Sequence, residues 1–277
     1  MPTEANNRQA FIMRKQIALT AENKRALWKQ LIRKKIENQS RALYLLSLDG
    51  RDKVEEYVSF IDEGGDPDTA EALAAKRYFE KFSPGFGRRD ETPLNSQLDY
   101  GYAVLRNVII RALLCAGFQP ALGIHHDNKY NAFNLADDLI EPWRPMVDIT
   151  AAAEPANDIR LSKEERYAMA MSQHHTCRMD GKEVTVLSGI SLMVSSLQRY
   201  VLGNEDTELV LPELYMRVTT NRKSAETHIN RMKDKLPDTG KIVTAIFTER
   251  QYSNLRYLVG SPSAQETIIG ANCHIAL

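Results

Sequence analysis

The sequence predicts a mainly α-helical protein, in which a helical domain is followed by a small α+β unit. Apolar side chains recur at three- and four-residue spacing over most of the first 200 residues, as expected for amphipathic helices. After about residue 207 the pattern changes to segments rich in β-formers, LVLPELYMRV and KIVTAIFT, on either side of one helical stretch. We therefore expect two domains, over residues 1–212 and 213–277.

Composition excludes several classes of protein. The chain is 43% apolar, enough for a sizeable core, yet it contains no apolar run of 18 residues that would span a membrane. Its cysteines, Cys115, Cys177 and Cys273, are far apart and show no C-x-x-C spacing. This argues against a zinc knuckle or a disulfide framework and fits a reducing cytoplasm. The net charge of zero leaves nucleic-acid binding open, because local clustering of basic residues decides it.

The first helical region is basic. Residues 12–48 predict one long helix or two joined helices, and Glu22 is the one acidic residue within its basic run from Arg14 to Lys35. This face is either simply solvated or in contact with DNA phosphates, and a nuclease site elsewhere would favour the second interpretation. The residues that we expect to bind DNA are Arg14, Lys15, Lys24, Lys29, Arg33 and Lys34.

Further elements follow in order. A turn-rich break over 62–69, with Thr69 as N-cap, precedes a helix over 70–82 and a loop over 83–93. A strongly apolar helix ends at Gly117 and is expected at the centre of the fold, and an extended segment PALGIHH follows it. Pro142 and Pro145 should interrupt the next helix, and residues 162–201 hold two helical patterns around an MDGK turn.

Glu71 is the first candidate for chemistry. It shares a helical face with Ala74, Ala75, Tyr78 and Phe79, and a carboxylate on an apolar face is costly unless it is paired or binds a metal. The alternative is a carboxylate near the helix start that interacts with the helix dipole.

The other two candidates are His126 and Glu141. In an extended PALGIHH segment His125 and His126 would point in opposite directions, so one of them would face inward; a lone histidine there is also compatible with a structural role. Asp138 and Glu141 share a helical face and would repel each other without a cation between them, and Asp137 is an alternative to Asp138. An exposed acidic helix end is the simpler explanation. Two carboxylates and an imidazole suit Mg²⁺ or Mn²⁺, and Mn²⁺ accepts nitrogen more readily.

The block LDYGYAVLRNVIIRALLCAGFQPALGIHHDNKYNAFNLADDLIEPWRPMVD closely resembles the larger subunit of the CRISPR adaptation complex, in the form found in Cas9-containing systems. The resemblance extends back through RKQIALTAENKRALWKQLIRKKIENQ and forward to about Pro212. It implies a metal-dependent DNA endonuclease and integrase that inserts new spacers, with in-line attack on a phosphodiester. The partners implied are double-stranded DNA (protospacer and repeat), a second copy of the chain and the small adaptation subunit, in the cytoplasm of a prokaryote and without a membrane.

The resemblance also assigns site residues. The family's glutamate lies in E-G-x-A-A-x-x-Y-[FW], here Glu71 to Phe79, with Ala72 in place of the usual glycine. Its histidine closes G-[FLI]-x-H, which selects His126, and its second acid closes D-[LI]-[MI]-E, which selects Glu141. The resemblance therefore implies Glu71, His126 and Glu141 as catalytic metal ligands for Mg²⁺ or Mn²⁺, with Asp138 as a nearby further ligand.

Two departures from the family pattern concern the ends of the sequence. The family begins with a β-rich domain that supports dimerisation, and here the helical part follows Met1 within a dozen residues. The segment from ELYMRV to LVGS resembles the small ferredoxin-like partner subunit, without its first strand and helix. We therefore expect a partial ferredoxin-like unit after residue 212. A non-catalytic DNA-binding or assembly remnant of the complex is the alternative to an active enzyme.

Overall fold

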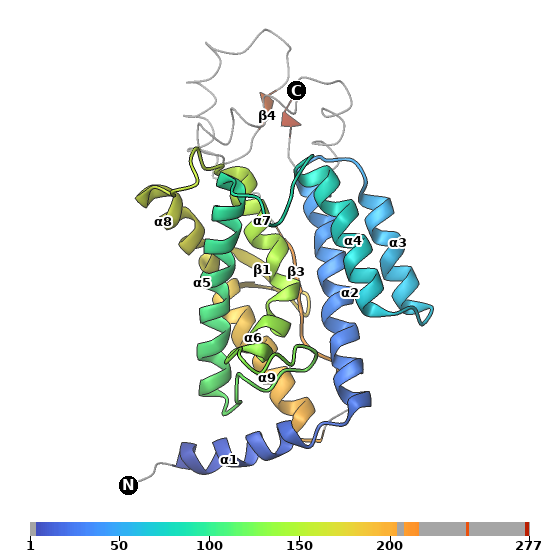
Figure 1. Cartoon of the computed structure of the whole chain (residues 1–277), viewed down its shortest axis with the longest axis vertical. Helices are drawn as coiled ribbons and strands as arrows, with labels where there is room; N and C mark the ends of the chain where they lie inside the picture. The colour runs from blue at the N-terminus through green and yellow to red at the C-terminus, as the bar shows by residue number, and fades with distance from the viewer. Residues whose placement is uncertain (1–3, 204–207, 216–241, 244–274, 277) are drawn as a thin grey trace. The chain divides into compact units, whose positions relative to one another are not determined.

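The computed structural model describes residues 4–203, 208–215, 242–243 and 275–276 (Figure 1). Contacts divide the chain into two units, one of Met1–Leu43 with Leu48–Tyr215 and the other of Tyr44–Ser47 with Met216–Leu277. Every candidate site residue belongs to the first unit. The expected ferredoxin-like fragment lies almost wholly outside the described residues.

The described part of the chain is mainly helical, as the sequence predicts. Its α-helices are α1 (Glu4–Ile17), α2 (Ala21–Leu45), α3 (Arg51–Asp62), α4 (Pro67–Phe82), α5 (Pro93–Cys115), α6 (Asn134–Leu139), α7 (Arg144–Ala153), α8 (Lys163–Met171) and α9 (Val186–Val201). Short 3₁₀ helices are η1 (Glu141–Trp143) and η2 (Ser172–His174). The strands are β1 (Thr176–Met179), β2 (Lys182–Thr185), β3 (Pro212–Glu213), β4 (Ile242–Val243) and β5 (Ile275–Ala276). None of the described helices is long and apolar enough to cross a membrane.

The basic N-terminal region forms two helices, α1 and α2. Thr20 separates them and caps α2, because its hydroxyl accepts a hydrogen bond from the Asn23 amide at 3.1 Å. Residues 51–62, for which no element was predicted from the sequence, form α3, which packs on α4. Figure 1 shows α2, α3 and α4 side by side in one group of helices.

Helix α4 begins three residues earlier than expected. Its N-cap is Asp66, whose carboxylate accepts from the Thr69 amide at 2.9 Å, so the expected N-cap at Thr69 is wrong. Pro67 occupies the first turn, where its missing N–H carries no penalty. Glu71 therefore lies in the second turn of α4 and does not cap it.

Helix α5 is central, as predicted. It packs against α6, α7, α8 and α9, and Gly101 permits the close approach of α7, since a Cβ there would lie 2.5 Å from Val147 Cγ1. The helix ends at Cys115, and Gly117 follows with a φ of 85°, a conformation that glycine adopts without strain.

Two segments differ from expectation. PALGIHH is a series of turns and bends instead of an extended strand. The MDGK turn, expected between helices, closes a hairpin in which β1 pairs with β2. Asp180 and Gly181 both have positive φ, as a two-residue hairpin turn requires. Strand β3 adds to the other edge of β1, with Arg178 opposite Glu213, while β4 pairs with β5.

Candidate active site

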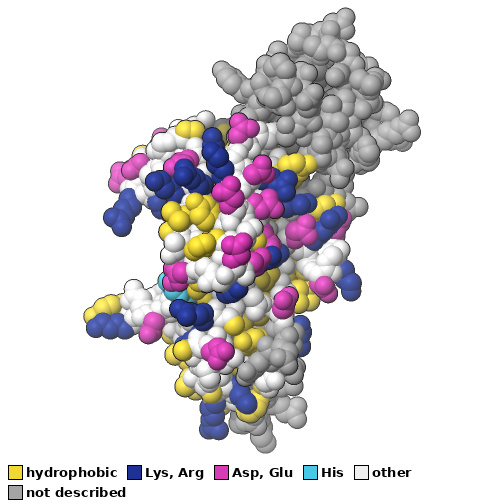
Figure 2. Space-filling model, turned by 90° about the vertical axis from the view of Figure 1, so that its right-hand side faces the viewer, with side chains coloured by type: hydrophobic (Ala, Val, Ile, Leu, Met, Phe, Trp, Pro, Cys, Tyr) yellow, Lys and Arg dark blue, Asp and Glu magenta, His cyan; other side chains and the backbone are white. Residues whose placement is uncertain are grey.

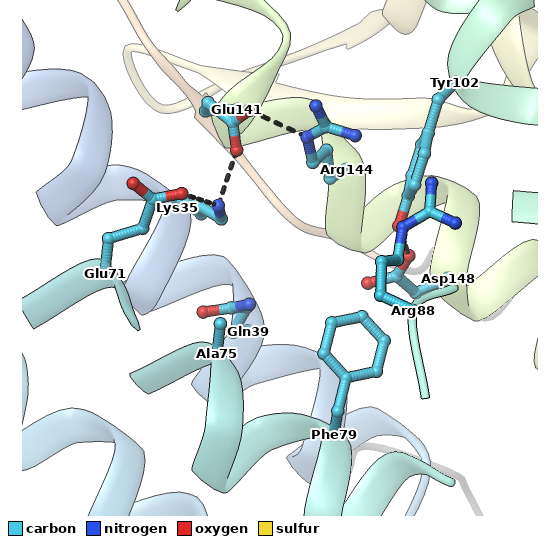
Figure 3. A pocket seen from close by; sticks show the side chains of 10 residues that line it. All are labelled: Lys35, Gln39, Glu71, Ala75, Phe79, Arg88, Tyr102, Glu141, Arg144 and Asp148. Carbon is cyan, nitrogen blue, oxygen red and sulfur yellow. Dashed lines mark hydrogen bonds and ion pairs between the residues drawn. The ribbon is translucent and has the colours of Figure 1, made fainter. Parts of the chain in front are cut away.

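Lys35 joins two of the predicted acids. Its Nζ lies 2.5 Å from Glu71 Oε1 and 2.5 Å from Glu141 Oε2 (Figure 3). Lys35 comes from α2, Glu71 from α4 and Glu141 from η1, so three segments distant in sequence meet at one ammonium group. The Lys35 side chain is buried, and the two carboxylates raise its pKa although burial alone would lower it.

Glu141 is buried and ionised. Burial favours its neutral form, but the positive charges of Arg144 and Lys35 outweigh this and lower its pKa to about 2. Arg144 Nε donates to Glu141 Oε1 at 2.8 Å. Oε2 is in ion-pair contact with Lys35, but no hydrogen bond from a described residue reaches it in good geometry. The simpler explanation of an exposed acidic helix end is therefore wrong for Glu141.

Asp138 and Glu141 do not share a face. Helix α6 ends at Leu139, and the two carboxylates have different partners. The fully buried Asp138 carboxylate accepts hydrogen bonds from the backbone amides of residues 124–126, at 2.6 to 3.1 Å. Asp137 instead pairs with Arg106. Asp138 thus organises the preceding loop, a role that explains why this segment is not a strand.

His126 is held by the same acid. Its Nδ1 lies 2.6 Å from Asp138 Oδ1, and this hydrogen bond raises the pKa of His126. The charge of Glu141 raises the pKa of His126 further. The half-exposed ring does not line the cavity beside Glu71 and Glu141, however. His125 does not point away from His126 as a strand would require, since it stacks on Trp28 at 4.1 Å and the His126 ring meets Trp28 edge-on at 5.9 Å.

The cavity beside the acids has a volume of about 270 Å³. Besides the acid pair and Lys35 it is lined by the side chains labelled in Figure 3, namely Gln39, Ala75, Phe79, Arg88, Tyr102, Arg144 and Asp148. The expected apolar face of α4 is split: Ala74 and Tyr78 are in the core, and Ala75 and Phe79 line the cavity beside Glu71.

Asp148 is a buried acid that the sequence analysis did not single out. Its carboxylate accepts hydrogen bonds from Tyr78 at 2.9 Å and Tyr102 at 2.5 Å. Burial raises the pKa of Asp148 to about 6, although the tyrosine hydroxyls and the charge of Arg144 oppose this increase. The spacing of Arg144 and Asp148, four residues apart, was the available signal that both lie on one helical face.

The carboxylate oxygens of Glu71 and Glu141 and the ring nitrogen of His126 are atom types that bind divalent metals. Glu141 Oε2 and Glu71 Oε1 are carboxylate oxygens that share one cation, the Lys35 ammonium. Carboxylate oxygens are the ligands that Mg²⁺ and Mn²⁺ prefer, and a histidine whose Nδ1 is fixed by a carboxylate is a common metal ligand. Among the described residues, no three histidine, cysteine or acidic side chains lie close enough together to hold an ion.

The basic helices are not one uninterrupted cationic face. Arg33 pairs with Asp62 at 2.9 Å, and Arg33 and Lys34 both pair with Glu37. Arg14 and Lys15 are exposed on α1, and Lys24 and Lys29 are half-buried on α2. In the view of Figure 2, basic and acidic side chains are interspersed. DNA binding by these six residues stays a prediction.

Ala72, which stands where the resemblance expects glycine, is exposed on α4. Its methyl group is not among the side chains that line the cavity, so it does not narrow the space beside Glu71.

The fold of this chain is similar to that of solved structures. The solved structure described as "Casposase bound to integration product" has a TM-score of 0.62 to this chain at 20% identity, and covers 78% of this chain and 74% of that one. This likeness concerns the fold.

Sequence comparison identifies the family. The model for "CRISPR associated protein Cas1" matches residues 1–165, and the chain belongs to the Cas1 family. The CRISPR-associated endonuclease Cas1 of Neisseria meningitidis serogroup C (strain 8013) is 32% identical over 221 residues, which cover 77% of this chain and 72% of that protein. The CRISPR-associated endoribonuclease Cas2 of Ligilactobacillus salivarius (strain UCC118) is 36% identical over 74 residues, which cover 24% of this chain and 73% of that protein.

Proposed function

We propose that this chain is a metal-dependent DNA endonuclease and integrase, which cleaves or joins phosphodiesters in CRISPR spacer acquisition. The observation that carries the proposal is the pair of carboxylates, Glu71 and Glu141, brought from two helical segments onto one buried cation, Lys35. Membership of a family whose relatives are named endonucleases supports the same reaction class.

Glu71, Glu141 and His126 would hold the metal once they are drawn together around it, since the metal-free structure does not group three such side chains closely among its described residues. Glu141 is suited to this because its pKa of about 2 keeps it ionised at any physiological pH. Asp138 binds Nδ1 of His126 and so leaves Nε2 as the ring atom available to a ligand. When bound, Mg²⁺ or Mn²⁺ supplies Lewis-acid polarisation of a phosphoryl oxygen. The nucleophile would be a DNA 3′-hydroxyl in strand joining and water in cleavage.

The partners proposed are double-stranded DNA, a second copy of the chain and a Cas2-type small subunit. The similarity of 24% of this chain to a Cas2 protein supports a link between the two kinds of subunit. The exposed basic residues of α1 and the half-buried ones of α2 would contact the DNA backbone without reading its sequence.

The test is cleavage and strand transfer on branched DNA with Mg²⁺ or Mn²⁺. Glu71→Gln and Glu141→Gln keep the shape of each side chain but remove its charge, and we expect each to reduce the rate by at least about 100-fold. Glu80→Gln is the matched control, because Glu80 is also on α4 but is exposed and pairs with Arg77. Equal rates for Glu71→Gln and the parent would overturn the proposal. A parent that binds DNA without cutting or joining it would indicate the remnant instead.

A further inference from the structure

We propose that Lys35 takes the place of the metal between Glu71 and Glu141 while no metal is bound, and that metal binding transfers its ammonium group to the side-chain oxygen of Gln39. Lys35 is then a positioning residue with two alternative positions. It holds the two acids together for a cation, and it competes with that cation for them. The inference rests on the proposed function, because it takes Glu71 and Glu141 as metal ligands.

In its first position the ammonium group fills the space of a shared cation. Lys35 Nζ lies 2.5 Å from Glu71 Oε1 and 2.5 Å from Glu141 Oε2 (Figure 3). The other oxygen of Glu141 is also in use, because it accepts from Arg144 Nε at 2.8 Å. An ion bound by both carboxylates would lie where the ammonium group lies, and two cations in contact in a buried place repel each other strongly. A metal therefore binds both acids only after a cation has left them.

Lys35 is the cation that leaves. The Arg144 guanidinium lies 4.6 Å from the centre of the Tyr102 ring, and this second contact holds it in place beside Glu141. The ion pairs of Lys35 with described residues are those with the two acids, so Lys35 loses both when the acids turn to a metal. Its four-carbon stem is flexible, and an ammonium group can donate in several directions. The ammonium group can therefore move while its backbone stays in α2.

Gln39 offers the second position. Its Oε1 is buried and has no hydrogen-bond partner among the described residues, although buried polar atoms in folded proteins are almost always paired. Because this oxygen is closed to solvent, a neighbouring side chain is the nearest source of a donor. Gln39 follows Lys35 by four residues, which places both on one face of α2. Both also line the cavity of about 270 Å³, in which the Lys35 side chain has room to turn (Figure 3).

The positions of the proposed ligands fit a state that Lys35 holds. The two acids converge on the ammonium group, whereas the His126 ring does not line their cavity. Among the described residues, no three side chains of ligand type are close enough together to hold an ion. Departure of Lys35 removes the contact that fixes the acids in this arrangement, so the same movement frees their oxygens and lets them turn toward His126.

The experiment measures Mn²⁺ affinity by calorimetry on the full chain without DNA, at one pH and one salt concentration. Lys35→Met should bind Mn²⁺ at least about tenfold more tightly than the parent, because no ammonium group competes with the ion. Gln39→Met should bind it about three- to tenfold more weakly, because the displaced ammonium group loses its acceptor. In the Lys35→Met background, Gln39→Met should have no effect on the affinity. If Lys35 acted through its charge alone, replacing the uncharged Gln39 would change nothing in either background.

Melting temperatures separate the transfer from general effects. Without Mn²⁺, Gln39→Met should melt at or above the parent's temperature, because it removes an unpaired buried oxygen, yet Mn²⁺ should stabilise it less than the parent. Gln97→Met is the matched control, since the buried Gln97 amide is bonded at both ends, to Glu154 and Ala156. It should lower the melting temperature and leave the Mn²⁺ affinity unchanged.

The outcomes distinguish this proposal from the proposed function. Equal Mn²⁺ affinities of the parent and Lys35→Met would overturn the displacement of Lys35 and leave the metal site intact. An affinity of Gln39→Met equal to that of the parent would overturn the transfer to Gln39, and this variant gives an answer even if Lys35→Met does not fold. Absence of Mn²⁺ binding in the parent and in both variants would overturn the metal site together with the transfer. Cleavage by Glu71→Gln is measured separately and tests the proposed function alone.

Discussion

At the scale of single residues, the site depends on Lys35, whose ammonium group contacts both Glu71 and Glu141. Two carboxylates on one cation are stable in a buried position only when their charge is neutralised, and Lys35 and Arg144 do this for Glu141. Lys35 is one of the basic residues of the region 12–48, yet it is buried. The available signal was its position between Leu31, Ile32 and Ile36, which all face the core.

Lys35→Met should destabilise the metal-free chain. It leaves Glu141 and Glu71 without their shared cation, and loss of one partner of a buried pair costs about 3–5 kcal/mol. Because a divalent ion would replace the lost charge, Mn²⁺ should raise the melting temperature of Lys35→Met more than that of the parent. Lys34→Met is the control, since among the described residues Lys34 pairs with the partly exposed Glu37 alone, and it should change stability by less than about 0.5 kcal/mol. If Mn²⁺ raises both melting temperatures equally, the acid pair does not bind it.

Asp148 should make stability depend on pH. Its pKa is raised by burial from 3.8 to about 6, so the folded state holds the proton more tightly than the unfolded state. The folded state is then favoured below pH 3.8, and this contribution is lost as pH rises to 6, by at most about 3 kcal/mol. Asp148→Asn, which does not ionise, should flatten this part of the profile, as measured by urea unfolding between pH 4 and 7. If the stability of Asp148→Asn changed with pH as that of the parent does, Asp148 would not titrate between pH 4 and 7.

At the scale of elements, periodic segments were predictable and the loop beside the site was not. The central helix α5, its glycine stop and the proline interruptions at Pro142 and Pro145, after Glu141, follow from sequence spacing. The prediction of an extended strand for PALGIHH was wrong because Asp138 sets the conformation of this segment. Asp138 lies twelve positions beyond His126, and its carboxylate accepts hydrogen bonds from three backbone amides. No local pattern records such a contact. The Asp180–Gly181 pair predicted a turn, but its preference for β-hairpins was the local signal for β1 and β2 that the helical interpretation missed.

Gly123 should be essential to this loop. A Cβ at this position would lie 2.1 Å from the His126 carbonyl oxygen and 2.9 Å from Asp138 Oδ2. Gly123→Ala should therefore displace the loop, lower stability by about 1–3 kcal/mol and weaken any metal binding that uses His126. Gly85→Ala is the control, because its Cβ would meet nothing within 4 Å and it tests only the cost of a positive φ. Thermal unfolding and the histidine resonances of both variants measure the effect, and an unchanged His126 resonance in Gly123→Ala would contradict it.

At the scale of the whole molecule, the last residues of the first unit bind back to its helix α2. Asn38 on α2 donates to the carbonyl oxygens of Pro142 at 2.8 Å and Pro212 at 2.9 Å, and accepts from the Leu214 amide at 3.0 Å. One buried amide thus joins α2, η1 and β3. The acids on η1 and α4 reach Lys35 on α2 only while these segments stay together, so the segment after residue 207 supports the site although it lies outside it.

A chain that ends at Tyr215 should therefore fold, and one that ends at residue 207 should be much less stable. The first keeps β3 paired with β1 and all three Asn38 hydrogen bonds. The second loses two of these bonds and the buried Leu209 and Leu214 side chains, which together should cost at least about 3 kcal/mol. Circular dichroism melts of the two truncations and of the full chain measure this, and Asn38→Ala in the longer truncation should reproduce part of the loss. Equal melting temperatures for the two truncations would show that residues 208–215 do not hold η1 against α2, and the geometry of the acid pair would then need another support.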